Sequence, residues 1–188
     1  MNFKKIIPSL FLAIAVSFSS LANTTNPEND KNKTSKTTKE EKTIVGVAAG
    51  NKNFTTLVAA VKAAGLVDVL SSKGPFTVFA PVNEAFGKLP EGTVANLLKP
   101  ENKELLTAIL TYHVVAGEFK AAAVIKAIQD NNGKFVITTV QGSTLTASLK
   151  DGKVILTDVK GNVSTIVITD VAASNGVIHA IDSVVMPK

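Results

Sequence analysis

The chain has 188 residues, 45% of them hydrophobic, so it is long enough to bury the core of one sizeable domain. All 20 basic residues are lysines, and a chain without arginine is a poor candidate for specific recognition of nucleic-acid bases. The absence of cysteine excludes disulfides and a lipid-modified N-terminal cysteine, so stability has to come from burial and hydrogen bonding.

The N-terminus has the three parts of an export signal. Two lysines precede an apolar run over residues 6–18, and Ser20 and Ala22 have the small side chains that a signal peptidase recognises. We therefore predict a signal peptide at residues 1–22, with cleavage before Asn23. The apolar run is shorter than the roughly 20 residues that an uncleaved membrane anchor needs. The mature protein is expected to be secreted or periplasmic, with no membrane span.

Residues 23–42 form a polar stretch that contains no Val, Ile, Leu or Phe. A segment with nothing to bury does not fold by itself, so we predict a disordered linker. Its five lysines are nearly balanced by four acidic residues, which argues against a basic tail for membranes or nucleic acid. The folded domain is expected to span residues 43–188.

The folded region opens with helical periodicity. A short apolar element is expected at residues 44–49. Asn53 is predicted to cap an amphipathic helix that Gly65 ends, because glycine accommodates the left-handed conformation of a helix C-terminus. The apolar face of this helix consists of Phe54, Leu57, Val58 and Val61.

The stretch around Pro81 combines a strand end with a helix start. The apolar run at residues 76–80 predicts a short buried strand, and Phe79 is expected to lie between the sheet and the helices. Pro81 ends the strand because it has no N–H group for the next hydrogen bond. Asn83 is predicted to cap the following helix, in which Phe86 turns back toward the strand.

Two further helices and a strand are predicted next. A helix over residues 101–111 has acidic residues in its first turn, where the helix dipole favours them. Its broad apolar face is expected to be buried and consists of Leu105, Leu106, Ile109 and Leu110. The pattern changes toward a strand at residues 112–115, and a short helix follows over residues 121–128.

Beyond residue 130 the pattern changes to alternation of apolar residues with Thr or Ser. Leu145, Ala147 and Leu149 alternate with hydroxyl side chains in the clearest case. Glycine-containing turn pairs separate such runs at Asn132-Gly133, Gln141-Gly142, Asp151-Gly152, Gly161-Asn162 and Asn175-Gly176. This pattern predicts an antiparallel meander with one solvated face. Because helices precede strands, the predicted fold class is α+β.

Three segments, in order, carry a family resemblance. They are Thr77–Pro81 with Asn83 and Phe86, Leu110–Gly117, and Ala173–Asp182 followed by Pro187. These segments resemble the signature segments of the fasciclin domain, and the match spans residues 43–188. The resemblance implies a wedge of two packed β-sheets with a cluster of N-terminal helices. It also implies a role in adhesion at cell surfaces or in the extracellular matrix. Val82 departs from the family pattern, which usually has Thr or another small polar residue there.

The resemblance supplies the candidate site residues. Eight residues are expected to maintain the fold: Phe79, Pro81, Asn83, Phe86, Asn175, Gly176, His179 and Asp182. Tyr112 and His113 correspond to a pair that has been linked to integrin binding in some animal relatives. A histidine between apolar runs is more often a core residue bonded to backbone, and this favours a structural interpretation of the pair over a contact point.

Metal and catalytic sites are not expected. The chain has only two histidines and no cysteine, and His179 and Asp182 need not converge on one point. The sequence contains no Gly-x-Ser-x-Gly elbow, no phosphate-binding glycine loop and no carboxylate pair in an apolar setting. We therefore predict no cofactor and no enzymatic activity.

The predicted function is that of an exported adhesion or surface-interaction module. Its expected partner is a cell-surface or matrix protein or a polysaccharide, and the module is expected to be a monomer. The alternative is a carrier that holds a polysaccharide, a lipid or another small ligand between the sheets and the helices. A filled core with an exposed patch would favour adhesion, whereas an apolar cavity of a few hundred Å³ would favour a carrier.

Overall fold

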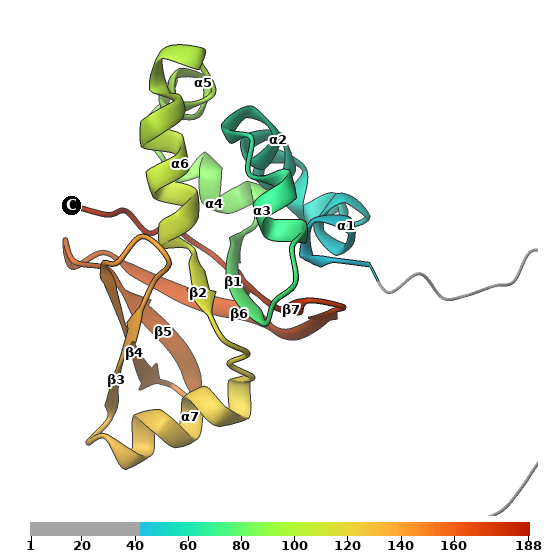
Figure 1. The fold of residues 1–188 in the computed structure, drawn as a ribbon. Coiled ribbons are helices and arrows are strands. Elements are labelled where there is room, and N and C mark those ends of the chain that lie inside the picture. The colour runs from blue at the N-terminus through green and yellow to red at the C-terminus, as the bar shows by residue number, and fades with distance from the viewer. Residues whose placement is uncertain (1–41) are drawn as a thin grey trace, which may run out of the picture. The chain divides into compact units, whose positions relative to one another are not determined.

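The computed structural model describes residues 42–188 (Figure 1). The predicted signal peptide and the predicted linker, apart from Lys42, lie outside the described residues. The described chain begins with helices and ends with strands, and the predicted α+β class is confirmed by this arrangement. None of the helices within residues 42–188 has the length and hydropathy needed to cross a membrane.

Nine short helical segments make up the helical part of residues 42–188. They are α1 (Ile44–Ala49), the 3-10 turn η1 (Lys52–Phe54), α2 (Thr55–Ala64), α3 (Val67–Ser71), α4 (Asn83–Gly87), α5 (Thr93–Leu97), the 3-10 turn η2 (Pro100–Asn102), α6 (Lys103–Tyr112) and α7 (Ala121–Asp130). Gly65 ends α2 with a φ of 73°, as the sequence predicts. The strand expected to begin at Tyr112 begins at Val114 instead, because Tyr112 ends α6 and His113 caps it.

Seven strands form one mixed sheet. They are β1 (Phe76–Pro81), β2 (Val114–Ala116), β3 (Lys134–Thr138), β4 (Thr144–Lys150), β5 (Lys153–Thr157), β6 (Val163–Ala173) and β7 (Gly176–Ile181). Their order across the sheet is β2-β1-β7-β6-β5-β4-β3. Strands β1 and β7 are parallel, and the other pairs are antiparallel. The predicted meander therefore occupies β3 to β7.

The long strand β6 belongs to both halves of this sheet. Its first residues, Val163–Thr165, pair with β5, and its later residues pair with β7. Register shifts lie between Ile166 and Ile168 and between Ile168 and Val171. Such irregularities bend a strand. The two sheets implied by the family resemblance are thus two halves that share β6.

Two hydrophobic cores lie on opposite faces of β1. Val78 and Ala80 pack in the core that contains residues of α1, α2, α3 and α6. Phe79 points the other way because successive strand residues face opposite sides. Its side chain is fully buried in the second core, with Leu145 and Leu156 from the other half of the sheet. The Phe79 ring therefore lies between the two halves of the sheet, and the helical residues of the same core, Tyr112, Val124 and Ile128, come from α6 and α7 and not from the helices before β1.

Two leucines are more exposed than the sequence pattern predicts. Leu105 on α6 is 52% exposed, whereas Leu106, Ile109 and Leu110 are buried. The apolar stripe of α6 is narrower than expected, because the helix buries only one face and Leu105 lies outside it. Leu149 is 36% exposed because it is near the end of β4, beyond the inner core.

Candidate functional site

Tyr112 and His113 are inside the protein. The Tyr112 side chain is fully buried, and its hydroxyl donates to the carbonyl oxygen of Thr144 at 2.7 Å and accepts the N–H of Val159 at 3.3 Å. Burial raises the pKa of the Tyr112 phenol. The tyrosine thus joins the end of α6 to the start of β4 and to the β5–β6 connection, and its ring offers no surface to a partner.

His113 is 1% exposed and uses both ring nitrogens internally. Nδ1 lies 2.8 Å from the carbonyl oxygen of Ile109, which can only accept, so Nδ1 carries the proton. Nε2 accepts the N–H of Val185 at 3.3 Å. Burial lowers the pKa of His113 to about 4, because the charged ring would lose its hydration. The imidazole is therefore neutral and holds the C-terminal segment against α6.

His179 is also fully buried. Its Nε2 donates to the carbonyl oxygen of Phe119 at 2.7 Å, and its Nδ1 accepts the N–H of Asp170 at 3.2 Å. The ring stacks on Phe79 with centroids 5.8 Å apart. Both nitrogens are occupied by backbone groups, so His179 is in no position to serve as a ligand or a base in this arrangement.

Asn175 connects three backbone segments that are distant in sequence. Its Oδ1 accepts the N–H of Ile44 at the start of α1, at 2.9 Å. Its Nδ2 donates to the carbonyl oxygens of Leu70 and Ser72, each at 2.8 Å. One amide side chain thus completes the hydrogen bonds of a helix start and a helix end.

Gly176 is required by close packing of β7 on β1. A Cβ atom on this residue would lie 1.9 Å from the carbonyl oxygen of Phe76, far inside van der Waals contact. The chain therefore accepts only glycine here, and this places the Asn175 side chain beside α1 and α3.

Asn83 does not cap its own helix. Helix α4 begins at Asn83, and the preceding Val82 gives no side-chain cap. Asn83 Oδ1 instead accepts the N–H of Thr56 at 3.1 Å, and its Nδ2 donates to the carbonyl oxygen of Lys52 at 2.8 Å. The sequence-based prediction that Asn53 caps α2 is also wrong, because Asn83 satisfies the start of that helix from a different part of the chain.

Pro81 and Phe86 are the motif residues that lie near Asn83 in the sequence. Pro81 is the buried last residue of β1, where the strand ends as predicted, and the next N–H, that of Val82, donates to Ile181. Phe86 on α4 is half-buried against both the helical core and the smaller cluster formed by Ala85, Ile109 and Val184. Both side chains therefore contribute to the packing of the domain interior.

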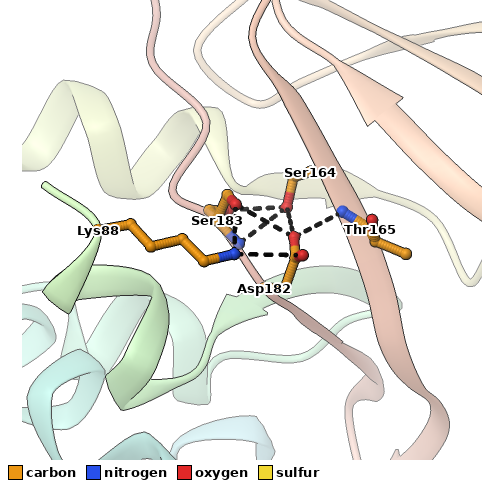
Figure 2. Close-up of polar contacts among 5 residues, drawn as sticks. All are labelled: Lys88, Ser164, Thr165, Asp182 and Ser183. Atoms are coloured by element: carbon orange, nitrogen blue, oxygen red, sulfur yellow. Dashed lines mark hydrogen bonds and ion pairs between the residues drawn. The ribbon is translucent and has the colours of Figure 1, made fainter.

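Asp182 is the centre of a polar network (Figure 2). Its Oδ1 accepts the N–H of Thr165 at 2.8 Å, and its Oδ2 lies 3.3 Å from Lys88 Nζ. Ser164 and Ser183 complete the cluster, and Ser164 Oγ donates to the carbonyl oxygen of Ser183 at 2.8 Å. The network joins the residue after α4 to β6 and to the end of β7.

The Asp182 carboxylate stays ionised at neutral pH. Burial acts to raise its pKa, but the Thr165 N–H and the Lys88 ammonium outweigh burial, and the pKa lies below its ordinary value. A carboxylate that is already paired and ionised is a poor general acid. Asp182 also lines a surface groove of about 380 Å³, together with residues that include Asn53, Glu84, Lys88, Val167 and Ile168.

The described residues contain no arrangement of three or more His, Asp or Glu side chains that could hold a metal ion. The structure brings the two histidines to separate internal positions and places Asp182 in a third, at the surface. The polar motif residues Asn83, Asn175, His179 and Asp182 each bond to backbone groups, and the motif residues do not converge on a reaction centre.

Comparison with known proteins decides the family. The family model of the Fasciclin domain matches residues 52–187. The chain belongs to the fasciclin-domain family. Protein sll1483 of Synechocystis sp. is 56% identical over 145 residues, which cover 77% of this chain and 73% of that protein. Immunogenic protein MPB70 of Mycobacterium bovis is 43% identical over 149 residues, which cover 76% of this chain and 68% of that protein.

A solved structure has the same fold. The FAS1 domain pair from the insect cell adhesion molecule Fasciclin I matches with a TM-score of 0.67 at 19% sequence identity. The match covers 76% of this chain and 50% of that chain. At this identity the likeness shows the fold, and it confirms the fasciclin-like architecture expected from the three sequence segments.

A further buried carboxylate of this fasciclin domain, Asp158, lies outside the sequence motifs. It is 5% exposed, and its Oδ1 accepts the N–H groups of Lys160 and Asn162 at 2.9 and 2.8 Å. Its Oδ2 accepts the N–H of Met186 at 3.0 Å. Burial acts to raise the Asp158 pKa, but these bonds hold it below its ordinary value. The signal in the sequence is an aspartate at the start of a turn, and its bond to the N–H of Lys160, two residues later, is typical of an Asx-turn.

Proposed function

We propose that this fasciclin domain is a non-enzymatic interaction module that acts in adhesion through its outer surface. The motif residues support this proposal, because the side chains that could do chemistry are used for backbone hydrogen bonds. His113 and His179 have both ring nitrogens bonded internally, and the Asp182 carboxylate is paired with Lys88. What the domain offers to a partner is therefore its surface.

The filled core is the observation that carries the proposal. An apolar hollow lined by residues of α1, α2 and α6, with Leu57 and Leu110 among them, holds about 30 Å³. That is room for about one water molecule, whereas sites for small ligands usually measure roughly 300–1,000 Å³. Larger hollows of about 800 and 380 Å³ lie at the surface. These volumes favour adhesion over the alternative of a carrier with an internal lipid or ligand.

The proposed location is outside the cytoplasm, in the periplasm or beyond the cell. The predicted signal peptide at residues 1–22 supports export. Fasciclin I, whose domain pair shares the fold, is a cell adhesion molecule. We propose by analogy a cell-surface or matrix protein or a polysaccharide as the partner, and a monomeric module.

Adhesion of beads coated with the chain from Asn23 onward tests the proposal. Coated beads should attach to cell envelopes or matrix preparations more strongly than beads coated with an unrelated protein of equal charge. Native mass spectrometry of the same preparation should show the mass of the polypeptide alone. Failure to attach, together with a co-purified lipid or glycan enclosed in the fold, would favour the carrier instead.

A further inference from the structure

The outer face of strands β3 to β6 carries a continuous row of small side chains. Val136 on β3 is opposite Thr146 on β4, Thr146 is opposite Thr157 on β5, and Thr157 is opposite Val163 on β6. Directly opposed residues project from the same face of a sheet. Val136 is 59% exposed and Val163 is 51% exposed, so this row faces solvent.

The other face of these strands is the buried one. Ile137, Leu145, Ala147 and Leu156 alternate with the outer row and lie in the core beside α7. The hydroxyl side chains that share the outer face by register or alternation are Thr138, Thr144, Thr146, Ser148, Thr157 and Thr165. Strands are about 4.8 Å apart and same-face residues about 6.7 Å apart along a strand, so the hydroxyls form a regular grid.

Lysines outnumber carboxylates at one end of this outer face. Lys134, Lys150 and Lys153 are the charged residues of β3, β4 and β5, which contain no Asp or Glu. All three are exposed, and the ion pairs found within residues 42–188 involve other lysines. Lys150 and Lys153 are directly opposite each other, which is destabilising for like charges, and Asp151 in the turn between them is the one carboxylate of the β4–β5 hairpin.

We propose that the outer face of β3 to β6 binds an acidic polysaccharide, with its carboxylates at Lys134, Lys150 and Lys153. The sugar hydroxyls hydrogen-bond with the threonine grid, and the apolar sugar faces contact Val136 and Val163. Each sugar of such a polymer carries hydroxyls as well as a carboxylate, so one stretch of it can meet the lysines at one end and the hydroxyl grid beyond them. This inference rests on the proposed function and deepens it by naming a surface and a partner class.

Charge argues against two other occupants of this face. A second copy of the chain would present the same three lysines and no complementary acidic row on β3, β4 or β5, so charge offers no attraction for self-association through this face. Nucleic acid is disfavoured because the chain has no arginine. The outer residues of β3, β4 and β5 also include no aromatic ring on which a base could stack, since Phe135 alternates to the inner side.

Soluble polygalacturonate is a suitable probe, with neutral dextran as the comparison polymer. We expect the triple variant K134Q/K150Q/K153Q to bind polygalacturonate at least about tenfold more weakly than the parent chain. The matched control K62Q/K99Q/K103Q removes the same charge from exposed positions on α2, just before η2 and on α6, and should change affinity less than about twofold. T146V/T157V removes hydroxyls without changing charge and should also weaken binding. Thermal melting verifies that every variant is folded.

The outcomes separate this inference from the proposed function. If both lysine variants lost the same affinity for polygalacturonate, net charge alone would explain the binding, and the inference would be overturned. The same follows if the parent binds dextran, anionic lipid vesicles or single-stranded DNA as tightly as polygalacturonate. Beads that adhere while polygalacturonate does not bind would leave the proposed function intact and overturn the inference. Polygalacturonate binding that depends on the three lysines, without any adhesion, would support the inference and contradict the proposed function.

Discussion

The side-chain oxygen of Asn83 accepts the backbone N–H of Thr56 at 3.1 Å, so a residue on α4 caps the start of α2. The same oxygen accepts the Thr55 hydroxyl at 3.1 Å, and the Asn83 amide donates to Lys52. A helix start leaves N–H groups without partners, and an Asn side chain satisfies them well. Here the cap comes from another helix, so it also fixes how α4 and α2 pack together.

Asn83→Ala should lower the free energy of unfolding by about 1–2 kcal/mol, because it removes the cap of α2 and a donor to Lys52. The measurement is urea unfolding monitored by circular dichroism. Asn53→Ala is the matched control, since the Asn53 side chain is exposed and only its backbone N–H is bonded, to Asn51. Its effect should be within about 0.5 kcal/mol. A larger loss for Asn53 than for Asn83 would contradict this assignment.

Local signals in the sequence predict most of the fold. Gly65, the Asn-Gly and Asp-Gly turns and the alternation in β4 act through their own φ angles and side-chain directions, so each can be recognised without knowledge of the rest. The cap on Thr56 could not be predicted in this way. Its donor and acceptor are 27 residues apart, and the helix it stabilises carries no cap of its own.

Phe79→Ala should destabilise the domain by about 3–5 kcal/mol, a large part of a typical total of roughly 5–15 kcal/mol. The ring is fully buried between the two halves of the sheet and stacks on His179, so truncation leaves a cavity that neither half can close. Phe79→Leu retains most of the volume and should cost less than half as much. Chemical denaturation measures both, and equal melting of Phe79→Ala and the parent would contradict the placement.

Gly176→Ala should prevent folding or nearly so, because the new Cβ would lie 1.9 Å from the carbonyl oxygen of Phe76. Gly161→Ala is the comparison. Its φ of 85° also disfavours alanine, but nothing lies within 4 Å of a Cβ there. It should cost only about 1–2 kcal/mol, for the backbone conformation alone. Soluble expression and thermal melting distinguish the two, and similar stabilities would show that β7 can move away from β1.

The candidate site was less predictable than the fold. The resemblance identifies the motif residues, but their roles depend on partners far away in sequence, such as Asn175 with Ile44 over 131 residues. His113 illustrates the limit. Its apolar flanks predict burial, yet nothing in the sequence shows that its Nε2 accepts the N–H of Val185, 72 residues later.

Two titratable side chains hold successive N–H groups of the C-terminal segment. His113 Nε2 accepts from Val185, and Asp158 Oδ2 accepts from Met186. Burial lowers the pKa of His113 from 6.5 to about 4. Between these values the unfolded chain takes up a proton at His113 and the folded chain does not, so stability falls as the pH falls. Folding also lowers the pKa of Asp158. Protonation of this carboxylate in the unfolded chain reduces stability further only when the pH falls below the ordinary Asp value of 3.8.

His113 should therefore make stability decline by about 3 kcal/mol between about pH 7 and pH 4, at about 1.4 kcal/mol per pKa unit. Urea unfolding at several pH values measures this decline.

His113→Gln should be less stable at pH 7 by about 1–3 kcal/mol, because the Ile109 and Val185 groups lose their partner, and its decline above pH 4 should be shallower. Binding to envelope or matrix preparations, measured on the same sample, should fall only as far as the protein unfolds. Unchanged melting with lost binding would instead make Tyr112 and His113 a contact surface.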